Sequence, residues 1–348
     1  MEYIAIIGLF LISFRYYSIL NTLKGKYLLL LLTSVPVVFI ICCNVLDKTY
    51  ILYPYMFAVC SWKMDFKRIL KYYFLINLII LIPTTLASSA GLIKNFVFFR
   101  DGINVIDMAA TGMAKVRQCF GYNYPTAYAA HVFYLVVMLF VLRSGVFKWY
   151  DYFGIGLSSF IVYEYCDARL DTLTIIIVAV FSLFYTFFKN RRFLFTNNFF
   201  LKYSIIFISL FMIGLTFLYM FVQNDILELT NIALSGRLAL GADALQDFGV
   251  KILGQEYVQI AYDDPLRYNF IDCSYVMLLV IYGLIFFIFA ICCHVAVCKK
   301  SINNKDYVLP LSVIIVAIHC AVVSDLMTFA FNPFYLGAFA NINSFKKL

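Results

Sequence analysis

Three arginines are the residues whose type and spacing most clearly offer chemistry. Arg117 lies just before Gly121 and Pro125, where a turn and a helix start are predicted. Arg169 lies in a short connector crowded with charges, and Arg237 follows a serine and a glycine in the longest polar loop. A guanidinium group binds phosphate through two parallel hydrogen bonds, and a helix N-terminus adds free N–H groups. The pattern predicts an anionic ligand; for Arg117, pairing with a lipid headgroup or a neighbouring acid is the equal alternative.

Three side chains are candidate proton acceptors. Asp167 belongs to the charged connector. Asp272 opens a hydrophobic segment, where the favoured alternative role is to cap a helix. His131 lies within a hydrophobic segment, where a neutral histidine bonded to a nearby carbonyl is the favoured alternative.

Two further expectations concern the surroundings of the arginines. If the connector is helical, its acids fall on one face and Arg169 points elsewhere, so its own segment does not obviously neutralise it. These acids are Glu164, Asp167 and Asp171. Arg169 could then meet an external anion or pair with the acidic long loop. Ser235 is predicted to cap a helix with Arg237 in its first turn. Positive charge opposes the helix dipole there, so a partner anion is expected.

The sequence predicts neither a metal site nor a cofactor. The three histidines fall in hydrophobic segments without a partner at metal-binding spacing. Asp263-Asp264 precedes Pro265 and is typical of a turn. The 10 cysteines include no C-x-x-C pair, and most are expected to be small buried hydrophobes. The three cysteines nearest the predicted outer face could form one disulfide; they are Cys119, Cys166 and Cys273.

The elements that must position these residues are membrane helices. The chain has 348 residues, 64% hydrophobic and 13% charged, whereas soluble domains are about half apolar and about a quarter charged. A bilayer-spanning helix needs roughly 20 apolar residues, and about eleven segments are candidates. We therefore predict an all-α polytopic membrane protein. The segments are 3–20, 27–43, 49–62, 70–92, 125–142, 151–166, 171–188, 201–222, 272–298, 307–323 and 326–342. Those at 49–62, 151–166 and 326–342 are short enough to be re-entrant.

The net charge of +8 follows membrane topology and does not indicate nucleic acid. Lysines and arginines concentrate in alternate connectors, which the positive-inside rule places in the cytoplasm. The N-terminus and the loops at 93–124 and 223–271 then lie outside, and the C-terminus lies inside. The long loop at 223–271 carries apolar residues at helical spacing up to Phe248, so it is predicted to fold. We expect one membrane domain over residues 1–348 that holds both loops.

Three motifs together resemble the Wzy-type polysaccharide polymerases of bacterial capsule, exopolysaccharide and O-antigen pathways, which are related to the O-antigen ligases. They are Arg117 through Gly121 to Tyr124-Pro125, Ser235-Gly236-Arg237, and Asp272-x-x-Tyr275 with Tyr282-Gly283-Leu284-Ile285. The likeness covers roughly 110–290. Relatives often carry a His-Pro-Asn-like turn where this chain has Tyr124-Pro125-Thr126, so a role for that histidine or asparagine does not transfer.

The resemblance implies a metal-independent glycosyltransferase on the outer face of the bacterial cytoplasmic membrane. It would join oligosaccharide repeat units carried on polyprenyl diphosphate, with a flippase and a chain-length regulator as further partners besides the lipid bilayer. The diphosphate-binding role passes to Arg117, Arg169 and Arg237. The general base would be one of Asp272, Asp167 and His131. Glycan contacts pass to Tyr122, Tyr124 and Tyr275, although an aromatic belt at the headgroup level is the commoner role of such tyrosines.

Three other classes of protein stay open. An O-antigen ligase would share the arginines and differ only in its acceptor. A flippase for lipid-linked oligosaccharides would normally show internal two-fold repetition, which this sequence lacks. A structural or signalling membrane protein would not need the folded loop and its arginines.

Overall fold

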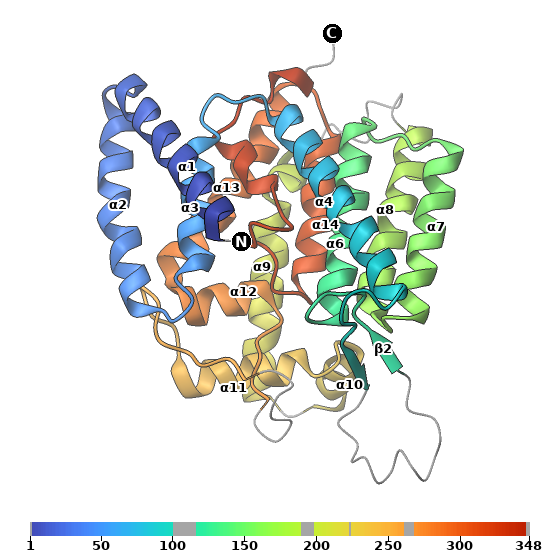
Figure 1. Ribbon diagram of the computed structural model, residues 1–348. Helices are drawn as coiled ribbons and strands as arrows, with labels where there is room; N and C mark the ends of the chain where they lie inside the picture. The colour runs from blue at the N-terminus through green and yellow to red at the C-terminus, as the bar shows by residue number, and fades with distance from the viewer. Residues whose placement is uncertain (1, 100–115, 189–197, 223, 261–267, 346–348) are drawn as a thin grey trace. The chain divides into compact units, whose positions relative to one another are not determined.

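The computed structural model describes residues 2–99, 116–188, 198–222, 224–260 and 268–345 (Figure 1). Helices joined by loops and turns make up most of these ranges, and the strands β1 (Val97–Phe99) and β2 (Val116–Gln118) form a two-stranded antiparallel ladder. Among the described residues, six helices are long and apolar enough to cross a membrane. They are α2 (Lys26–Asn44), α4 (Phe66–Ser89), α6 (Pro125–Leu142), α8 (Arg169–Phe188), α9 (Asn198–Phe221) and the span from Ser274 to Asn303. The chain is an all-α, multi-pass membrane protein.

The predicted count of about eleven spans is not confirmed. Four further segments are helical where the sequence predicts them, but they are not among the six. These are α1 (Glu2–Thr22), α3 (Thr49–Cys60), α7 (Trp149–Glu164) and α14 (Val308–Cys320). α3 and α14 are apolar but short.

The segment at 326–342 is the one place where the predicted helix is wrong. The structure has turns there and the five-residue 3-10 helix η4 (Phe334–Ala338). Asn332 is buried and uses both ends of its amide: Nδ2 donates to the carbonyl of Leu326 at 2.6 Å, and Oδ1 accepts from the N–H of Phe334 at 3.0 Å. These side-chain bonds compete with the helical backbone pattern, which hydropathy alone does not reveal.

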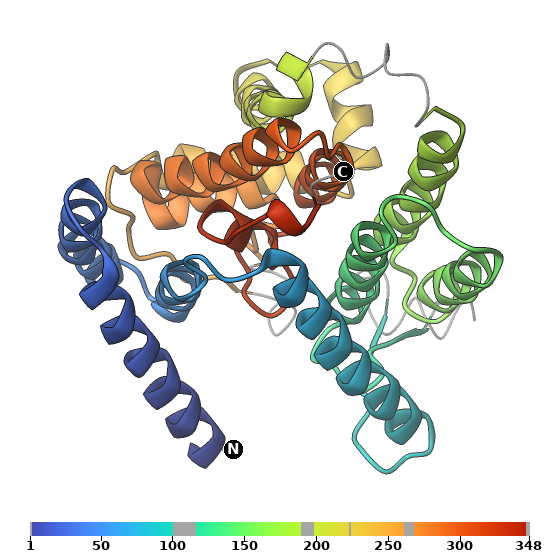
Figure 2. The same cartoon turned by 90° about the horizontal axis from the view of Figure 1, so that it is seen from above.

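One compact unit contains Met1–Phe66, Lys202–Asp306 and Cys320–Leu348. Within it, α3 packs against α1 and α2, and the long α13 (Gly283–Asn303) packs against η4, as Figure 2 shows for the orange helix and the red C-terminal segment. The long loop of this unit is folded, as predicted. It forms α10 (Asp225–Ala233) and α11 (Arg237–Phe248), and Gly249, which follows α11, has a positive φ of 64°.

A second compact unit contains Lys67–Leu201 and Tyr307–His319. α8 packs against both α6 and α7. Nearly every side chain of α6 from Tyr128 to Val141 is buried, because this helix is apolar on all sides. Pro125 begins α6, as the sequence predicts, since proline is tolerated where helical N–H groups have no partner.

The span from Ser274 to Asn303 is a broken helix. It comprises α12 (Ser274–Met277), the π-helical turn η3 (Leu278–Tyr282) and α13, and the break falls at Gly283, where φ is 87°. The loop residue Gly254 approaches this point so closely that a Cβ on Gly283 would lie 2.2 Å from the Gly254 nitrogen. Both glycines are therefore required by the contact. Gly254 itself lies in a loop and does not follow the end of a helix.

Residues 250–256, which we call the docking segment, supply the hydrogen bonds that the break removes. The bonds are Leu284 N to Lys251 O at 2.9 Å, Ile285 N to Ile252 O at 3.2 Å, Gln255 N to Ile281 O at 2.9 Å and Gln255 Nε2 to Val280 O at 2.8 Å. Backbone groups within a membrane span must find partners inside the protein. The long loop is therefore built into the membrane helix and does not merely connect helices.

Candidate functional site

The predicted arginines Arg117 and Arg169 both contact the turn between α7 and α8 in the second unit. Strand β2 holds Arg117, which pairs with Phe98 of β1, and the next residue, Gln118, donates its N–H to the carbonyl of Tyr165 at 2.8 Å. The Arg117 Nε then donates to the carbonyl of Cys166 at 2.9 Å. The β-ladder thus fixes Arg117 against the connector between α7 and α8.

The connector itself is not a continuous helix, so the expectation of one acidic face was wrong. α7 ends at Glu164 and α8 begins at Arg169, and Asp167 between them has a positive φ of 47°. This turn brings the Arg169 Nε to 3.3 Å from Asp167 Oδ1. Arg169 is therefore paired with an acid of its own segment after all.

We call Arg117, Asp167 and Arg169 the paired-arginine cluster. Each guanidinium group uses only its Nε within the described part of the chain, so the terminal amino groups of both arginines have no protein partner there. The Arg169 side chain is 61% exposed, whereas that of Asp167 is 2% exposed. The buried carboxylate orients Arg169 and leaves its amino groups outward, which is the geometry for binding an anion through two hydrogen bonds.

Asp167 has little access to a substrate hydroxyl, because its carboxylate is buried against Arg169. Two buried thiols lie beside the cluster, Cys119 and Cys166, and both are free. Burial raises the pKa of Cys119 to about 11 and raises the pKa of Cys166 further still. Neither thiol is ionised near neutral pH, so neither adds negative charge next to the arginines.

The tyrosines predicted to contact a glycan have different surroundings. Tyr122 lies 4.9 Å from the predicted base His131, measured between ring centroids, and burial raises the pKa of Tyr122 to about 12. Tyr124 precedes α6 and packs on Phe98. Tyr275 is fully buried, so this placement leaves it no face for a sugar.

A polar pair that sequence reasoning did not identify lies in the second unit. The buried His319, in the last turn of α14, stacks on Phe133 with ring centroids 3.8 Å apart. Its Nε2 lies 3.8 Å from Asp171 Oδ1, and its Nδ1 lies 3.1 Å from the Thr174 hydroxyl. The sequence shows Asp171 as a charged residue near a predicted helix start. No sequence pattern links it to His319, which lies far along the chain.

The third predicted arginine, Arg237, lies in the first unit and is held by three acceptors. It is the first residue of α11, as predicted, but Gly236 precedes the helix and Ser235 does not cap it. The Arg237 Nε donates to Val322 O at 2.6 Å and lies 3.6 Å from Asp272 Oδ2. Nη1 donates to Leu234 O at 3.0 Å. The expected partner anion is thus a carboxylate of the chain itself.

Asp272 does not cap the next helix, which was the favoured role. Cys273 precedes α12 and no side chain caps it. The Asp272 carboxylate faces Arg237 and is 25% exposed, so solvent reaches it far more than it reaches Asp167. Of the two predicted carboxylate bases, Asp272 is the more accessible to a substrate.

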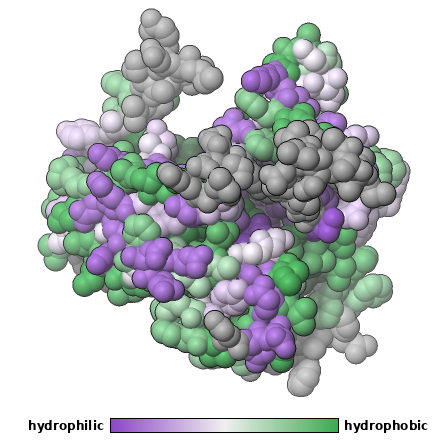
Figure 3. Space-filling view, turned by 90° about the horizontal axis from the view of Figure 1, so that it is seen from below, coloured by the Kyte–Doolittle hydropathy of each residue, from purple (hydrophilic) through white to green (hydrophobic). Residues whose placement is uncertain are grey.

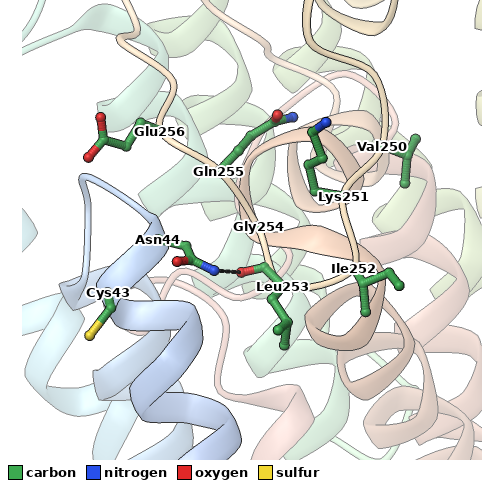
Figure 4. A pocket seen from close by; sticks show the side chains of 9 residues that line it. All are labelled: Cys43, Asn44, Val250, Lys251, Ile252, Leu253, Gly254, Gln255 and Glu256. Carbon is green, nitrogen blue, oxygen red and sulfur yellow. Dashed lines mark hydrogen bonds between the residues drawn. The ribbon is translucent and has the colours of Figure 1, made fainter.

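A shallow hollow of about 710 Å³ lies along the docking segment, between it and the end of α2 (Figure 4). Lys251, Gln255 and Glu256 supply its polar groups, and Asn44 from α2 donates to the carbonyl of Leu253 at 3.3 Å. None of the predicted site residues lines this hollow. The hollow therefore lies where the docking segment packs beside α2, and it is separate from the predicted arginine sites.

Comparisons with protein-family models, with curated proteins and with solved structures find no match for this chain. Fold and geometry therefore define the class: an all-α, multi-pass membrane protein with a folded loop docked into a broken helix, in which Arg169 and Arg237 begin helices α8 and α11.

Proposed function

We propose that this protein is a polysaccharide polymerase of the bacterial cytoplasmic membrane. It joins oligosaccharide repeat units carried on polyprenyl diphosphate at the outer face and releases polyprenyl diphosphate. The observation that carries the proposal is the paired-arginine cluster, in which two guanidinium groups keep their terminal amino groups available beside a membrane helix. The resemblance of the three sequence motifs to the polymerase family supports the same function.

Glycosyl transfer from a lipid diphosphate requires positive charge beside the leaving group, and the two arginines of the cluster supply it. An acceptor hydroxyl attacks the anomeric carbon of the donor sugar, the bond from that carbon to the diphosphate oxygen breaks, and a base takes the hydroxyl proton. Negative charge grows on the leaving diphosphate, which fixed guanidinium groups stabilise. Arg117 and Arg169 bind the diphosphate in this proposal. His131, which belongs to the same unit as the two arginines, is the candidate base that takes the proton.

The test is a strain that lacks the gene, in which polyprenyl-linked glycans are extracted, sized and assigned to one side of the membrane. Single repeat units on the outer face support a polymerase. Single units held inside indicate a flippase, and long lipid-linked chains that never reach their acceptor indicate a ligase. Unchanged lipid-linked glycans contradict all three functions.

Complementation of that strain tests the arginines. Arg169→Lys should leave the protein level unchanged, because the side chain is largely exposed, but should abolish chain extension, because lysine lacks the two-pronged donor. Arg143→Lys is the control, since Arg143 also pairs with an aspartate, Asp151, at 3.2 Å, but through two of its nitrogens and at the opposite end of α7. Normal polymer in Arg169→Lys would contradict the diphosphate-binding role.

A further inference from the structure

The short helix α10 carries an exposed apolar stripe. Ile226, Leu229 and Ile232 recur every three residues and are 70%, 66% and 65% exposed. Residues at this spacing project from the same side of a helix. Large apolar side chains this exposed, on one face of one helix, indicate an interaction surface and not a solvated loop.

The opposite side of α10 is fixed to the first unit, so the stripe has a defined direction. Leu227 and Asn231 are buried. Asn231 donates to the Tyr219 hydroxyl at 3.3 Å and accepts from the N–H of Ala239 at 3.1 Å. The same tyrosine donates to the Glu228 carboxylate at 2.8 Å. These bonds tie α10 to the end of α9 and to α11.

The stripe on α10 adjoins the exposed apolar surface of the membrane helix α9. α9 is one of the helices long and apolar enough to cross a membrane, and Leu218 and Phe221 in its last turn and Val222 just after it are exposed. α10 begins at Asp225, three residues after Val222. Figure 3 views the molecule from the side where α10 and α11 lie in Figure 1, and apolar patches adjoin polar ones on this face.

We propose that α10 lies in the plane of the membrane interface, with Ile226, Leu229 and Ile232 inserted into the lipid at the boundary between headgroups and acyl chains. A short helix with an apolar face and a polar remainder, directly after a membrane span, is the form that interfacial helices take. The occupant of the stripe is thus the bilayer that surrounds α9. The inference does not depend on the proposed function, since it rests only on exposure and continuity.

An embedded α10 also fixes the depth of the start of α11 relative to the bilayer. α10 leads directly into the corner at Ser235 and Gly236, so an embedded α10 holds the start of α11 at the level of the lipid phosphates. Arg237 occupies that corner. The helix therefore positions the loop with respect to the membrane, which the contacts of Arg237 alone do not do.

The experiment places a tryptophan at position 229 of the full chain, Leu229→Trp, in lipid nanodiscs containing phosphatidylcholine brominated on the upper acyl chain. The matched control is Gln246→Trp on the exposed, acidic side of α11. Fluorescence is compared with unbrominated discs and corrected with the parent chain, which has 2 tryptophans of its own. The added tryptophan at 229 should lose most of its fluorescence in brominated lipid, and the one at 246 should not.

Ile226→Trp and Ile232→Trp give the same measurement at two other positions of the stripe, so the test survives if one variant does not fold. Equal, weak quenching at the stripe and at Gln246→Trp would overturn the proposal. A stripe tryptophan that is shielded from water in native membranes but not quenched by brominated lipid would also overturn it, because a protein partner would then cover the stripe.

Discussion

Two arginines of this protein use their guanidinium groups in opposite ways. Arg169 makes one ion pair and is mostly exposed, whereas Arg237 is 13% exposed and joins Leu234, Val322 and Asp272. Arg237 thus connects the corner before α11 to two other segments of its unit. A substitution of Arg237 changes stability as well as any ligand contact, while a substitution of Arg169 reports on ligand binding alone.

We therefore expect Arg237→Lys to destabilise the protein by about 2 kcal/mol, because one ammonium group replaces a guanidinium that donates to two carbonyls and forms an ion pair with a carboxylate. The measurement is thermal unfolding of the purified protein in detergent. Arg169→Lys serves as the control and should unfold at the wild-type temperature. An unchanged Tm for Arg237→Lys would show that the three contacts contribute nothing to stability.

Asp243 and Asp247 of α11 give the loop a dependence on pH. Burial raises the pKa of Asp243 above its ordinary value of 3.8, and the neighbouring Asp247 carboxylate raises it further. A raised carboxyl pKa means that the folded state binds the proton more tightly than the unfolded state. The contribution of Asp243 to stability is therefore present below 3.8 and is lost as the pH rises through its raised pKa.

Asp243→Asn should accordingly raise the Tm at about pH 7, and the difference from wild type should shrink as the pH falls toward 3.8. Asp247→Asn removes the neighbouring charge but leaves Asp243 ionisable, so it should raise the Tm by less than Asp243→Asn does. Thermal unfolding over this pH range measures both. A difference for Asp243→Asn that is independent of pH would rule out the ionisation as its cause.

Sequence reasoning identified single residues better than their partners. Arg117, Arg169 and Arg237 stand out because charges are rare in this chain. The ion pair of Arg169, however, depends on the left-handed backbone at Asp167, which no local pattern predicts for an aspartate. Likewise the contact of Asp171 with His319 joins two helices far apart in the sequence, and only tertiary packing brings them together.

At the scale of elements, hydrophobic runs predicted where helices form, because length and hydropathy set the requirement for crossing a bilayer. They did not predict how a run is interrupted. The segment at 326–342 is as apolar as a helix, yet the amide of Asn332 redirects it into turns. The run at 272–298 is helical but broken at Gly283, and a single glycine in an apolar run does not indicate which segment will meet it.

The broken helix gives the sharpest prediction of this scale. Gly283→Ala forces a Cβ against the Gly254 backbone at a positive φ, and we expect a loss of stability on the order of 3 kcal/mol or more. Released from the helix, the docking segment should also be cut faster by trypsin at Lys251. Thermal unfolding and timed proteolysis are the measurements.

Gly214→Ala is the control for that variant. Gly214 lies in α9 with no atom within 4 Å of an added Cβ, so alanine should stabilise the helix by about 0.5 to 1 kcal/mol. If Gly283→Ala behaves like Gly214→Ala, the loop and the helix are not in tight contact.

At the scale of the molecule, the basic residues mark one end of the first unit. Lys63 donates its N–H to the carbonyl of Phe339, and the Lys300 ammonium donates to the carbonyls of Ala338 and Ala340. Both lysines therefore lie at the same end, beside the C-terminal segment. The positive-inside rule predicts that this end faces the cytoplasm.

A protease site inserted after Asn304, at the end of α13, should then resist protease added to intact spheroplasts and be cut only after lysis. A site inserted after Val258, in the long loop, should be cut in intact spheroplasts. Western blots of a terminal tag report both. The reverse pattern would invert the topology and place the loop on the cytoplasmic side, where the proposed polymerase could not use it.

The docking segment also sets how this protein can be recombined with a relative. The N–H groups of Leu284 and Ile285 donate to the carbonyls of Lys251 and Ile252, so the loop provides acceptors that the first turn of α13 needs. A chimera joined between residues 256 and 274 would combine a loop and a helix that have not been selected together. The smallest exchangeable module runs from the docking segment through Asn303, and a new loop can be grafted only upstream of it.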